Sequence, residues 1–295
     1  MPSILASLLE PVGEFVDSYS AREAEGAERL KHSRIAFVGL ARNCAVALGQ
    51  NLSMAERVGG MCKGWQLHIE SNDCEDQTLD VLAAFSTQHK QATFHYQMLG
   101  RQHYPSEFSG RRTIALAEYR DACQKWVRAC ASDADYVIVV DWDARGGWSE
   151  RGLLNGIGWL VELQGAYGMA STSLFQYDFG HGQQWLHYDL WALRGVGQPD
   201  CYYDTYRNNI GGWGFQWLPP VGSPPVLVAS AFGGMCIYRT DAYLKGTYDG
   251  VHDVEHVPFH QSIAQATGQH LFLNPSQRML MSWMESCEAA PQPSA

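Results

Sequence analysis

The sequence predicts an α/β fold, in which helices flank both faces of a mostly parallel, Rossmann-like sheet. Short apolar runs alternate with helical segments from Arg34 onward, which is the pattern of a chain built from βαβ units. The apolar run from Tyr136 to Val140 leads directly into Asp141 and Asp143, so two carboxylates follow a buried strand. Hydrophobic residues make up 46% of the 295 residues and charged residues 18%, which favours a large core over a disordered chain.

The expected strands and helices follow one another closely. The strands are rich in β-branched and aromatic residues, and the helices repeat apolar residues at helical spacing. We expect strands at 35–40, 65–70, 93–98 and 136–140, separated by helices at 43–58, 78–88 and 110–131. Further on we expect a helix at 153–163, strands at 166–172, 226–231, 235–238 and 271–273, and a helix at 257–267. Residues 176–225 are rich in Gly, Trp, Tyr, Asn and Pro, and they are expected to form an irregular lobe.

One large domain accounts for most of the chain, with an extension at each end. Apolar residues at helical spacing over 4–16, followed by a charged stretch, predict an N-terminal helical extension over 1–33. We expect this helix to pack on the domain or to join two subunits as a homodimer. The single domain is expected to cover 34–287, and the tail at 288–295 is expected to be frayed.

Charge and cysteine usage exclude several classes of protein. The formal net charge is −10, which argues against nucleic acid as a partner because no basic stripe is available to neutralise phosphates. No stretch is long and apolar enough to span a bilayer, and no signal-peptide pattern opens the chain. Eight scattered cysteines without a Cys-x-x-Cys pair are typical of a reduced, cytoplasmic protein. Peripheral attachment at the inner membrane face is the alternative location.

Asp141 and Asp143 are the strongest functional signal. The carboxyl edge of an open α/β sheet is where such folds bind ligands. Carboxylate oxygens are ligands for Mg²⁺ or Mn²⁺, and these ions usually also take oxygens from a substrate diphosphate. The pattern therefore indicates a metal-dependent enzyme that acts on a nucleotide-sugar, with Asp141 and Asp143 as metal ligands. The alternative is a strand that ends in a polar turn.

The ends of the first two strands also carry candidate binding residues. The segment from Gly39 to Asn43 opens a helix, whose N-terminal N–H groups suit a nucleotide phosphate or base edge. The alternative is an ordinary turn with Asn43 as helix N-cap. Glu70 and Asp73 follow the second strand, where acids are well placed for ribose hydroxyls or a base N–H. Nearby, Asp76 is a candidate for the same role or a helix cap.

Two arginines and a Glu-His pair complete the candidate site. Arg112 and Arg120 lie on the helix before the acid-bearing strand, and their guanidinium groups suit the phosphates of a leaving nucleotide. The alternative is a solvated basic helix face. Glu255 and His256 open a later helix, where they are candidates for a base, a sugar anchor or a metal ligand. The alternative for this pair is a structural role.

Four sequence blocks, taken in order, resemble the fungal capsule-associated (CAP59-like) α-mannosyltransferase family, which has the GT-A glycosyltransferase fold. The blocks lie at 69–78, 112–121, 137–143 and 188–195, with weaker similarity at 230–235 and 255–256. They are similar to the family's E-S-x-S-x-D-x-T, R-I-x-Y-L-A-x-V-R-N, metal-site strand and Y-D-x-W-x-x-R-D segments. Asp121, Gly195 and His256 replace the family's Asn, Asp and Cys, and the fungal members are membrane-anchored.

This resemblance implies a GT-A sheet with an irregular, Trp- and Gly-rich acceptor lobe, and a Mn²⁺ or Mg²⁺ cofactor. It implies transfer of a hexose, with GDP-mannose the favoured donor, to a saccharide or lipid-linked saccharide. The expected donor-binding residues are Gly39, Ala41, Arg42, Glu70, Asp73, Arg112, Arg120, Asp141, Tyr188, Trp191, Gly233 and Gly234. The expected catalytic residues are Glu255, His256, Arg120 and Asp189.

The stereochemistry and two other functions stay open at this point. Glu255 is the candidate base if the enzyme inverts, whereas retention, which the resemblance implies, needs front-face attack and no separate protein nucleophile. A sugar-nucleotide pyrophosphorylase is one alternative, but it needs a Gly-rich, basic phosphate loop after the first strand, and Gly39-Leu-Ala-Arg42 is a poor version of one. A non-catalytic carbohydrate-binding protein would explain the ten tryptophans but not the paired acids.

Overall fold

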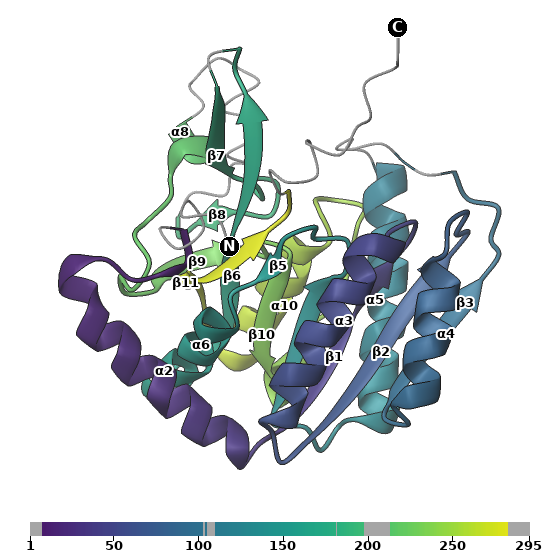
Figure 1. The fold of residues 1–295 in the computed structure, drawn as a ribbon, viewed down its shortest axis with the longest axis horizontal. Coiled ribbons are helices and arrows are strands. Elements are labelled where there is room, and N and C mark those ends of the chain that lie inside the picture. Colours follow the sequence, from purple (N-terminus) through teal and green to yellow (C-terminus); the bar gives the residue numbers. More distant parts are fainter. Residues whose placement is uncertain (1–7, 103, 105–109, 181, 198–212, 283–295) are drawn as a thin grey trace, which may run out of the picture.

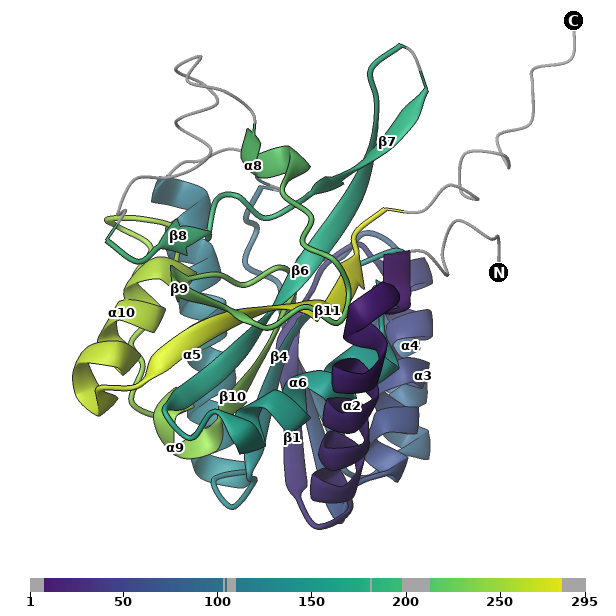
Figure 2. The ribbon, with the colours of Figure 1, turned by 90° about the vertical axis from the view of Figure 1, so that its left-hand side faces the viewer.

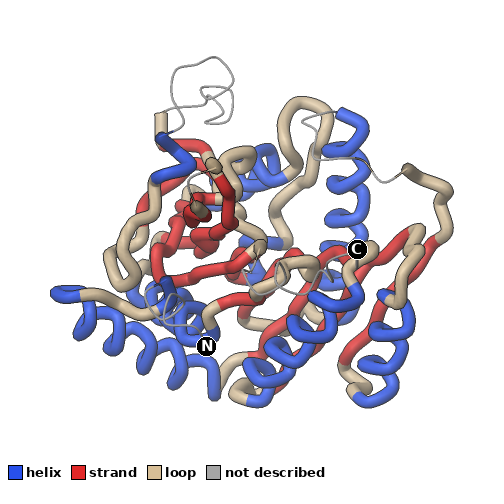
Figure 3. The backbone as a smooth tube through the Cα atoms, turned by 45° about the horizontal axis from the view of Figure 1, so that its top comes forward, coloured by secondary structure: helices blue, strands red, loops and turns tan. Residues whose placement is uncertain are grey.

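An 11-stranded sheet runs through the part of the chain that the computed structural model describes, which is residues 8–282 except 103, 105–109, 181 and 198–212. The strand order is β3-β2-β1-β4-β10-β6-β11-β9-β8, with β5 beside β11 and β7 beside β6. Helices cover both faces of the sheet (Figures 1 and 3). The predicted α/β class is therefore confirmed.

The N-terminal half of the sheet is parallel, and its strands all end at one edge. These strands are β3 (Ala92–Gln97), β2 (Gly64–Asn72), β1 (Arg34–Ala41) and β4 (Tyr136–Asp141). Leu40 of β1 pairs with Glu70 on one side and with Asp141 on the other. The register therefore brings the ends of the first, second and fourth strands together, as the sequence predicts.

Both faces of this parallel half are buried, which explains its continuous apolar runs. Ile35 and Phe37 of β1 belong to the core under α3 (Ala45–Gly60) and α4 (Thr78–Gln88). The alternate residues of β1 pack in the second core, under α5 (Gly110–Cys130). The three helices agree with the predicted segments to within two residues at each end.

The C-terminal half is antiparallel around β10, apart from the parallel pair β6 and β11. Its elements are β5 (Gly147–Trp148), α6 (Glu150–Glu162), β6 (Ala166–Asp178), β7 (Gln183–His187), β8 (Arg194–Gly195), α8 (Trp213–Gln216), β9 (Val226–Ser230), β10 (Met235–Arg239), α9 (Thr240–Tyr243), α10 (His256–Thr267) and β11 (His270–Leu280). The prediction of β11 is wrong in length, because this strand continues through a register shift between Asn274 and Arg278 around Pro275. Short elements such as β5, β7 and α9 were not predicted because they are too short to show a period.

The N-terminal prediction is wrong in the position of the helix. Residues 1–7 lie outside the described part, and the short helix η1 (Gly13–Phe15) interrupts the expected apolar helix. Gly13 has φ +52, a conformation that breaks a right-handed helix. The long helix is α2 (Val16–Lys31), and it covers the charged stretch instead.

Helix α2 packs along α6 on the outside of the molecule (Figure 2). A Cβ atom added to Gly26 would lie 1.8 Å from the carbonyl oxygen of Leu154, and one added to Gly158 would lie 2.0 Å from that of Arg22. Glycine at both positions therefore allows the two backbones to approach closely. Packing of the extension on the domain, one of the two predicted arrangements, is confirmed.

The ends and the thiols of the chain complete the comparison with the sequence. The predicted tail at 288–295 and the last residues of the predicted domain lie outside the described residues. Six cysteines within the described part are free thiols, and three of them, Cys44, Cys123 and Cys236, are buried. None of the described helices is both long enough and apolar enough to cross a membrane.

Candidate active site

A cavity of about 240 Å³ lies where α5, the end of β4, the segment after β7 and the start of α10 meet. It brings together eight predicted site residues, which are Arg112, Arg120, Asp141, Tyr188, Asp189, Trp191, Glu255 and His256. Six residues that the sequence did not single out complete the lining, and these are Leu116, Phe175, Ala192, Phe215, Phe232 and Val254. These eight predicted residues therefore meet in one place, although they come from segments far apart in the chain.

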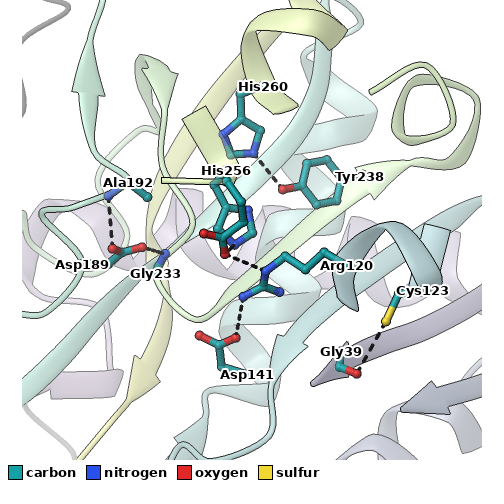
Figure 4. A network of polar contacts seen from close by, with 11 residues as sticks. Gly39, Arg120, Cys123, Asp141, Asp189, Ala192, Gly233, Tyr238, His256 and His260 are labelled. Carbon is teal, nitrogen blue, oxygen red and sulfur yellow. Dashed lines mark hydrogen bonds and ion pairs between the residues drawn. The ribbon is translucent and has the colours of Figure 1, made fainter. Parts of the chain in front are cut away.

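Arg120 lies at the centre of this cluster (Figure 4). Its Nε donates to Oε1 of Glu255 at 2.8 Å, and its Nη2 donates to Oδ1 of Asp141 at 3.0 Å. Burial lowers the pKa of Arg120, but the carboxylates of Asp141 and Glu255 outweigh burial and raise the pKa above its usual range. The alternative of a solvated helix arginine is wrong for Arg120, whose side chain is only 5% exposed.

The turn that carries the two acids sends them to different places. Asp141 lines the cavity, whereas the exposed Asp143 lines a second, wider groove of about 930 Å³ on the α3 side. Between them, Trp142 is fully buried in the core under α3. Burial raises the pKa of Asp141, Arg120 opposes this rise, and Asp143 adds to it. The two carboxylates therefore stand at the boundary between the cavity and the groove.

Asn51 of α3 forms hydrogen bonds with the backbone of this turn. Its Nδ2 donates to the carbonyl oxygen of Trp142 at 2.8 Å and to that of Ala144 at 3.0 Å, and its side chain is fully buried. The two carbonyls flank Asp143, so Asn51 fixes the backbone on both sides of that acid. This role leaves no signal in the sequence, because an asparagine within a helix is usually a surface residue.

Gly233 and Gly234 position two of the acids. Both have positive φ, +64 and +73, and a Cβ atom on Gly233 would lie 2.0 Å from the carbonyl oxygen of Ser171. The N–H of Gly233 donates to Oδ2 of Asp189 at 2.8 Å, and the carbonyl of Gly234 accepts from the N–H of Asp141 at 2.7 Å. Burial raises the pKa of Asp189, and the backbone N–H groups of Gly233 and Ala192 oppose that rise. Direct contact of either glycine with a donor stays a prediction.

His256 lies buried beside Glu255 with its imidazole stacked on Phe232, at 3.8 Å between ring centroids. Neither ring nitrogen of His256 has a hydrogen-bond partner. Burial, Arg120 and His260 all lower the pKa of His256 well below its usual value, so the imidazole is neutral. A neutral imidazole with free nitrogens can accept a hydrogen bond or bind a metal ion.

Aromatic side chains form one wall of the cavity. The rings of Tyr188 and Phe215 meet the ring of Phe175 edge-on, at centroid distances of 6.0 and 6.4 Å. The guanidinium carbon of Arg112 lies 5.5 Å from the ring centroid of Trp191. Phe175 and Tyr177 alternate with polar residues in β6, and this pattern could have identified Phe175. The predicted strand at 166–172 ended before it.

Arg194 anchors the segment that carries this wall. Its Nη2 donates to both carboxylate oxygens of Asp253, at 2.7 and 2.9 Å, and its Nη1 donates to the carbonyls of Trp191 and Leu193. Asp253 lies two residues before Glu255. The pair therefore ties the segment after β7 to the residues that lead into α10.

The wide groove contains other predicted residues. It runs beside the N-terminus of α3, and its polar lining includes Arg42, Asn43, Asp76, Asp143 and Arg145. Asn43 is not the N-cap of α3, because the first free N–H groups of that helix donate to Thr78 and Asp76 instead. Asp76 also accepts from the N–H of Thr78, the first residue of α4, but the N-cap of that helix is Gln77, so the alternative prediction is wrong by one residue.

Two residues that were expected to bind the donor, Arg42 and Asp73, form hydrogen bonds within the protein. Arg42 donates to the carbonyls of Arg101 and Gln102. Asp73 accepts a hydrogen bond from the side chain of Asn72 and three from the backbone N–H groups of Leu99, Gly100 and Arg101, and together these lower the pKa of Asp73 to about 2.

Three further residues that were expected to bind the donor line neither cavity. Glu70 accepts from His68 and His95, and Gly39 and Ala41 are buried within β1. A Cβ atom on Gly39 would collide with Val140 and Trp142, and the Gly39 carbonyl accepts from the thiol of Cys123 (Figure 4). Glu70, Gly39 and Ala41 line neither cavity, and their contact with a donor stays a prediction.

The chemistry of Asp141 and Asp143 fits a divalent cation. Mg²⁺ is commonly held by one or two carboxylates together with substrate phosphates and water. His256 is a further candidate ligand, because both of its ring nitrogens are buried without a hydrogen-bond partner. Its Nε2 lies 3.6 Å from Oε1 of Glu255. Within the described residues no three His, Cys, Asp or Glu side chains gather as a complete metal site.

The fold has counterparts among solved structures, although no protein-family model and no curated protein sequence matches the chain. It is similar to GalNAc-T7 in a structure with UDP, GalNAc and Mn²⁺, at TM-score 0.53 and 9% identity, over 94% of this chain and 55% of that one. It is also similar to the mannosyltransferase PcManGT from Pyrobaculum calidifontis, in complex with GDP-Man and Mn²⁺. This match has TM-score 0.49 and 11% identity, and it covers 90% of this chain and 66% of that one.

Mannosyl-3-phosphoglycerate synthase from Rubrobacter xylanophilus matches at TM-score 0.49 and 12% identity, over 95% of this chain and 80% of that one. From the coverages above, this chain spans about half the length of GalNAc-T7 and two thirds of the length of PcManGT. At 9% identity the similarity to GalNAc-T7 identifies the architecture and not the substrate. The chain has the GT-A fold of glycosyltransferases, as the sequence predicts, and membership of the CAP59-like family stays a prediction.

Proposed function

We propose that this protein is a metal-dependent glycosyltransferase that moves a hexose from a nucleotide-diphospho-sugar to a hydroxyl group of an acceptor. One observation carries the proposal: Arg120 joins Asp141, at the end of the acid-bearing strand, to Glu255, at the start of α10, inside an aromatic-lined cavity. A pyrophosphorylase has no need of a carboxylate and an aromatic wall opposite the acids. A carbohydrate-binding protein has no need of a buried arginine between two acids.

The two cavities support a division of the donor between them. The smaller one, of about 240 Å³, is below the roughly 300–1,000 Å³ of pockets for drug-sized ligands, so it has room for one sugar ring and not for a whole nucleotide-sugar. The wide groove bears Arg42 and Arg145 beside Asp143 and is open enough for a nucleoside diphosphate. The diphosphate would then cross the boundary at Asp141 and Asp143.

The side chains around the boundary have distinct roles in this proposal. Asp141 and Asp143 would hold Mn²⁺ or Mg²⁺, and the ion would supply positive charge that offsets the charge of the departing diphosphate. Arg120 is fixed by its two carboxylate partners before any substrate arrives, so it adds positive charge without reorganisation. Arg112, whose guanidinium lies over the ring of Trp191, comes from the same helix and also lines the cavity. The carboxylates of Glu255 and Asp189 face the space that the sugar would fill.

The acceptor hydroxyl must lose its proton during transfer. If the reaction inverts, Glu255 takes this proton, since it is the buried carboxylate at the start of α10. If it retains, the acceptor attacks from the side of the leaving diphosphate, whose departing oxygen takes the proton, and Glu255 and His256 bind the sugar or orient the acceptor. Asp189, held by two backbone N–H groups, serves as a fixed sugar anchor in both cases.

The identity of the donor is a separate part of the proposal. The sequence resemblance favours GDP-mannose, while GalNAc-T7 is described with UDP and GalNAc. Both nucleotides therefore belong in a donor panel. The acceptor by the same resemblance is a saccharide or lipid-linked saccharide.

The test is to incubate the full chain with Mn²⁺ and a panel of GDP- and UDP-sugars and to measure the free nucleoside diphosphate. A transferase slowly hydrolyses its own donor and releases the diphosphate without pyrophosphate. Formation of a nucleoside triphosphate on adding pyrophosphate would identify a pyrophosphorylase instead. No product from any donor, despite saturable binding of a sugar, would identify a binding protein.

A further inference from the structure

The hairpin formed by β6 and β7 carries exposed aromatic rings outside the cavity. It projects beyond the rest of the described chain in Figure 2. Tyr177, near the end of β6, is 52% exposed, and Phe179, at the tip, is 50% exposed. Their rings meet edge-on with 4.8 Å between centroids. Large aromatic side chains this exposed are unusual in a soluble domain and commonly mark a binding surface.

These rings continue the aromatic wall of the cavity. Side chains two residues apart in a strand lie on the same face, so Tyr177 follows Phe175, which lines the cavity against Tyr188 and Phe215. Tyr177 lies about 7 Å further along the strand than Phe175, at roughly 3.4 Å per residue. We refer to Phe175, Tyr177 and Phe179 as the aromatic track. A ligand that reaches from the cavity to the end of the track must be longer than one sugar ring.

The polar groups beside the track favour a neutral, hydroxyl-rich ligand. Gln184 lies directly opposite Tyr177 in the antiparallel pair, so its side chain shares the face of the track. Its amide can both donate to and accept from hydroxyl groups. The hairpin sequence 174–187 contains no Lys or Arg, so it offers nothing to an anionic membrane surface or to nucleic acid.

We propose that the aromatic track is an acceptor subsite that binds the distal sugars of an extended oligosaccharide, whose terminal sugar enters the cavity. This inference rests on the proposed function for the cavity itself. The faces of Tyr177 and Phe179 stack on successive sugar rings, while the amide of Gln184 binds sugar hydroxyls. The acceptor is therefore an oligosaccharide chain and not a monosaccharide or a small aglycone.

The test measures saccharide binding directly, without the transfer reaction. The full chain is titrated with monosaccharide to tetrasaccharide series of α-mannose, β-glucose and β-N-acetylglucosamine, and binding is followed by saturation-transfer NMR and calorimetry. The wild type should bind at least one series with affinity that rises with chain length. The double variant Tyr177→Leu/Phe179→Leu keeps apolar area but removes the aromatic faces. It should lose about tenfold in affinity for the longest saccharide, the scale of one or two aromatic contacts.

Two variants serve as controls. The double variant Tyr177→Trp/Phe179→Trp keeps aromatic faces and should bind like the wild type. Leu227→Ala removes another exposed apolar side chain, 42% exposed on β9, and should also bind like the wild type. Melting curves of all variants should coincide, because the changed side chains are exposed.

The outcomes separate this inference from the proposed function. Equal binding by the wild type and the leucine variant, or no binding to any series by an enzyme that hydrolyses a donor, would overturn the track alone. Saccharide binding by a chain that hydrolyses no donor would support the track and contradict the transferase. Binding of neutral phosphatidylcholine vesicles that persists in the leucine variant, without saccharide binding, would assign the tip to a membrane and overturn the inference.

Discussion

Arg120 and Glu255 form a buried ion pair, with 2.8 Å between Nε and Oε1 and only 5% of each side chain exposed. The pair joins α5 to the start of α10, and the second arm of Arg120 reaches Asp141. A cation shared by two carboxylates in this way offsets part of their charge when no substrate is bound. It also holds them at a fixed separation, on which a sugar and a diphosphate can be aligned.

The first prediction concerns the stability that Arg120 provides. Arg120→Ala leaves Asp141 and Glu255 buried without a partner, so the free energy of unfolding should fall by about 3–5 kcal/mol. Urea unfolding measures this loss. Arg34→Ala, which breaks the exposed pair with Asp133, is the control and should cost less than about 1 kcal/mol. Equal losses in the two variants would show that the buried pair has no special importance.

A second prediction separates the chemical role of Arg120 from its structural role. Arg120→Lys keeps the positive charge but cannot bridge Asp141 and Glu255 with a planar fork. Turnover should fall on the order of 10²-fold with little change in donor affinity, because a cation aligned with leaving-group charge acts mainly in the transition state. Steady-state kinetics with direct donor titration give both quantities. A variant that loses donor affinity and keeps turnover would contradict this role.

A third prediction concerns Asp143 as a metal ligand. Asp143 is exposed, so Asp143→Ala should leave the melting temperature unchanged. Affinity for Mn²⁺ should nevertheless fall by at least about tenfold, since removal of a metal ligand costs no less than removal of its supporting partners. Titration followed by Mn²⁺ electron paramagnetic resonance measures this. Asp121→Ala, at an exposed acid paired only with Lys125, should bind Mn²⁺ like the wild type.

Asn51 provides a fourth prediction, for a positioning residue. Asn51→Ala leaves the carbonyls of Trp142 and Ala144 without their donor, so it should cost about 1–3 kcal/mol of stability. Mn²⁺ affinity should also fall, by about 10–100-fold, as for other residues that support metal ligands. Asn155, a second fully buried asparagine, is the matched control, because it donates to Tyr19 far from the acids. Asn155→Ala should destabilise to a similar extent and leave Mn²⁺ affinity intact, and a parallel loss of affinity would refute the positioning role.

The fifth prediction concerns acid stability. Burial lowers the pKa of His260 to about 3, where His260 contacts Ser230 and Tyr238 at 2.8 Å each. In the unfolded chain His260 takes up a proton near pH 6.5, but in the folded chain only near pH 3. The contribution of His260 to the free energy of unfolding is therefore fully present above pH 6.5 and is lost as the pH falls below it. By pH 4.5 the loss should reach about 2–3 kcal/mol for this one histidine.

Urea unfolding between pH 7.5 and 4.5 measures that dependence. His260→Gln should reduce the slope of stability against pH by close to one proton, because glutamine does not titrate. His252→Gln, at an exposed histidine, is the control and should keep the slope of the wild type. An unchanged slope in His260→Gln would show that His260 is protonated in the folded chain.

Much of the parallel half could be predicted from the sequence. Apolar runs buried on both faces leave a clear signal, and the predicted helix at 78–88 coincides with α4. The C-terminal half was less predictable, because β7 and β8 are short and depend on pairing with distant strands. The N-terminal helix was misplaced because apolar spacing dominated the interpretation, whereas Pro11 and Gly13 interrupt that segment.

The polar part of the candidate site was largely predictable, but its geometry was not. Asp141, Arg120 and Glu255 were identified singly, since acids at strand ends and arginines on neighbouring helices are typical of phosphate chemistry. Only the fold shows that Arg120 bridges the other two. Asn51 and Phe232 act through contacts with residues distant in the chain, and such contacts leave no local pattern.

Glu255 offers the most direct test of the account, through single-turnover transfer by Glu255→Gln compared with the wild type, with donor binding measured on the same samples. The substitution keeps the shape of the side chain and removes its charge, so it tests chemistry and not packing. Donor should bind within a few-fold of the wild type, while transfer falls by about 10²–10⁴-fold, the scale for loss of a positioned acid–base or electrostatic group. Normal transfer by Glu255→Gln would contradict the assignment of this cavity as the place where the sugar is moved.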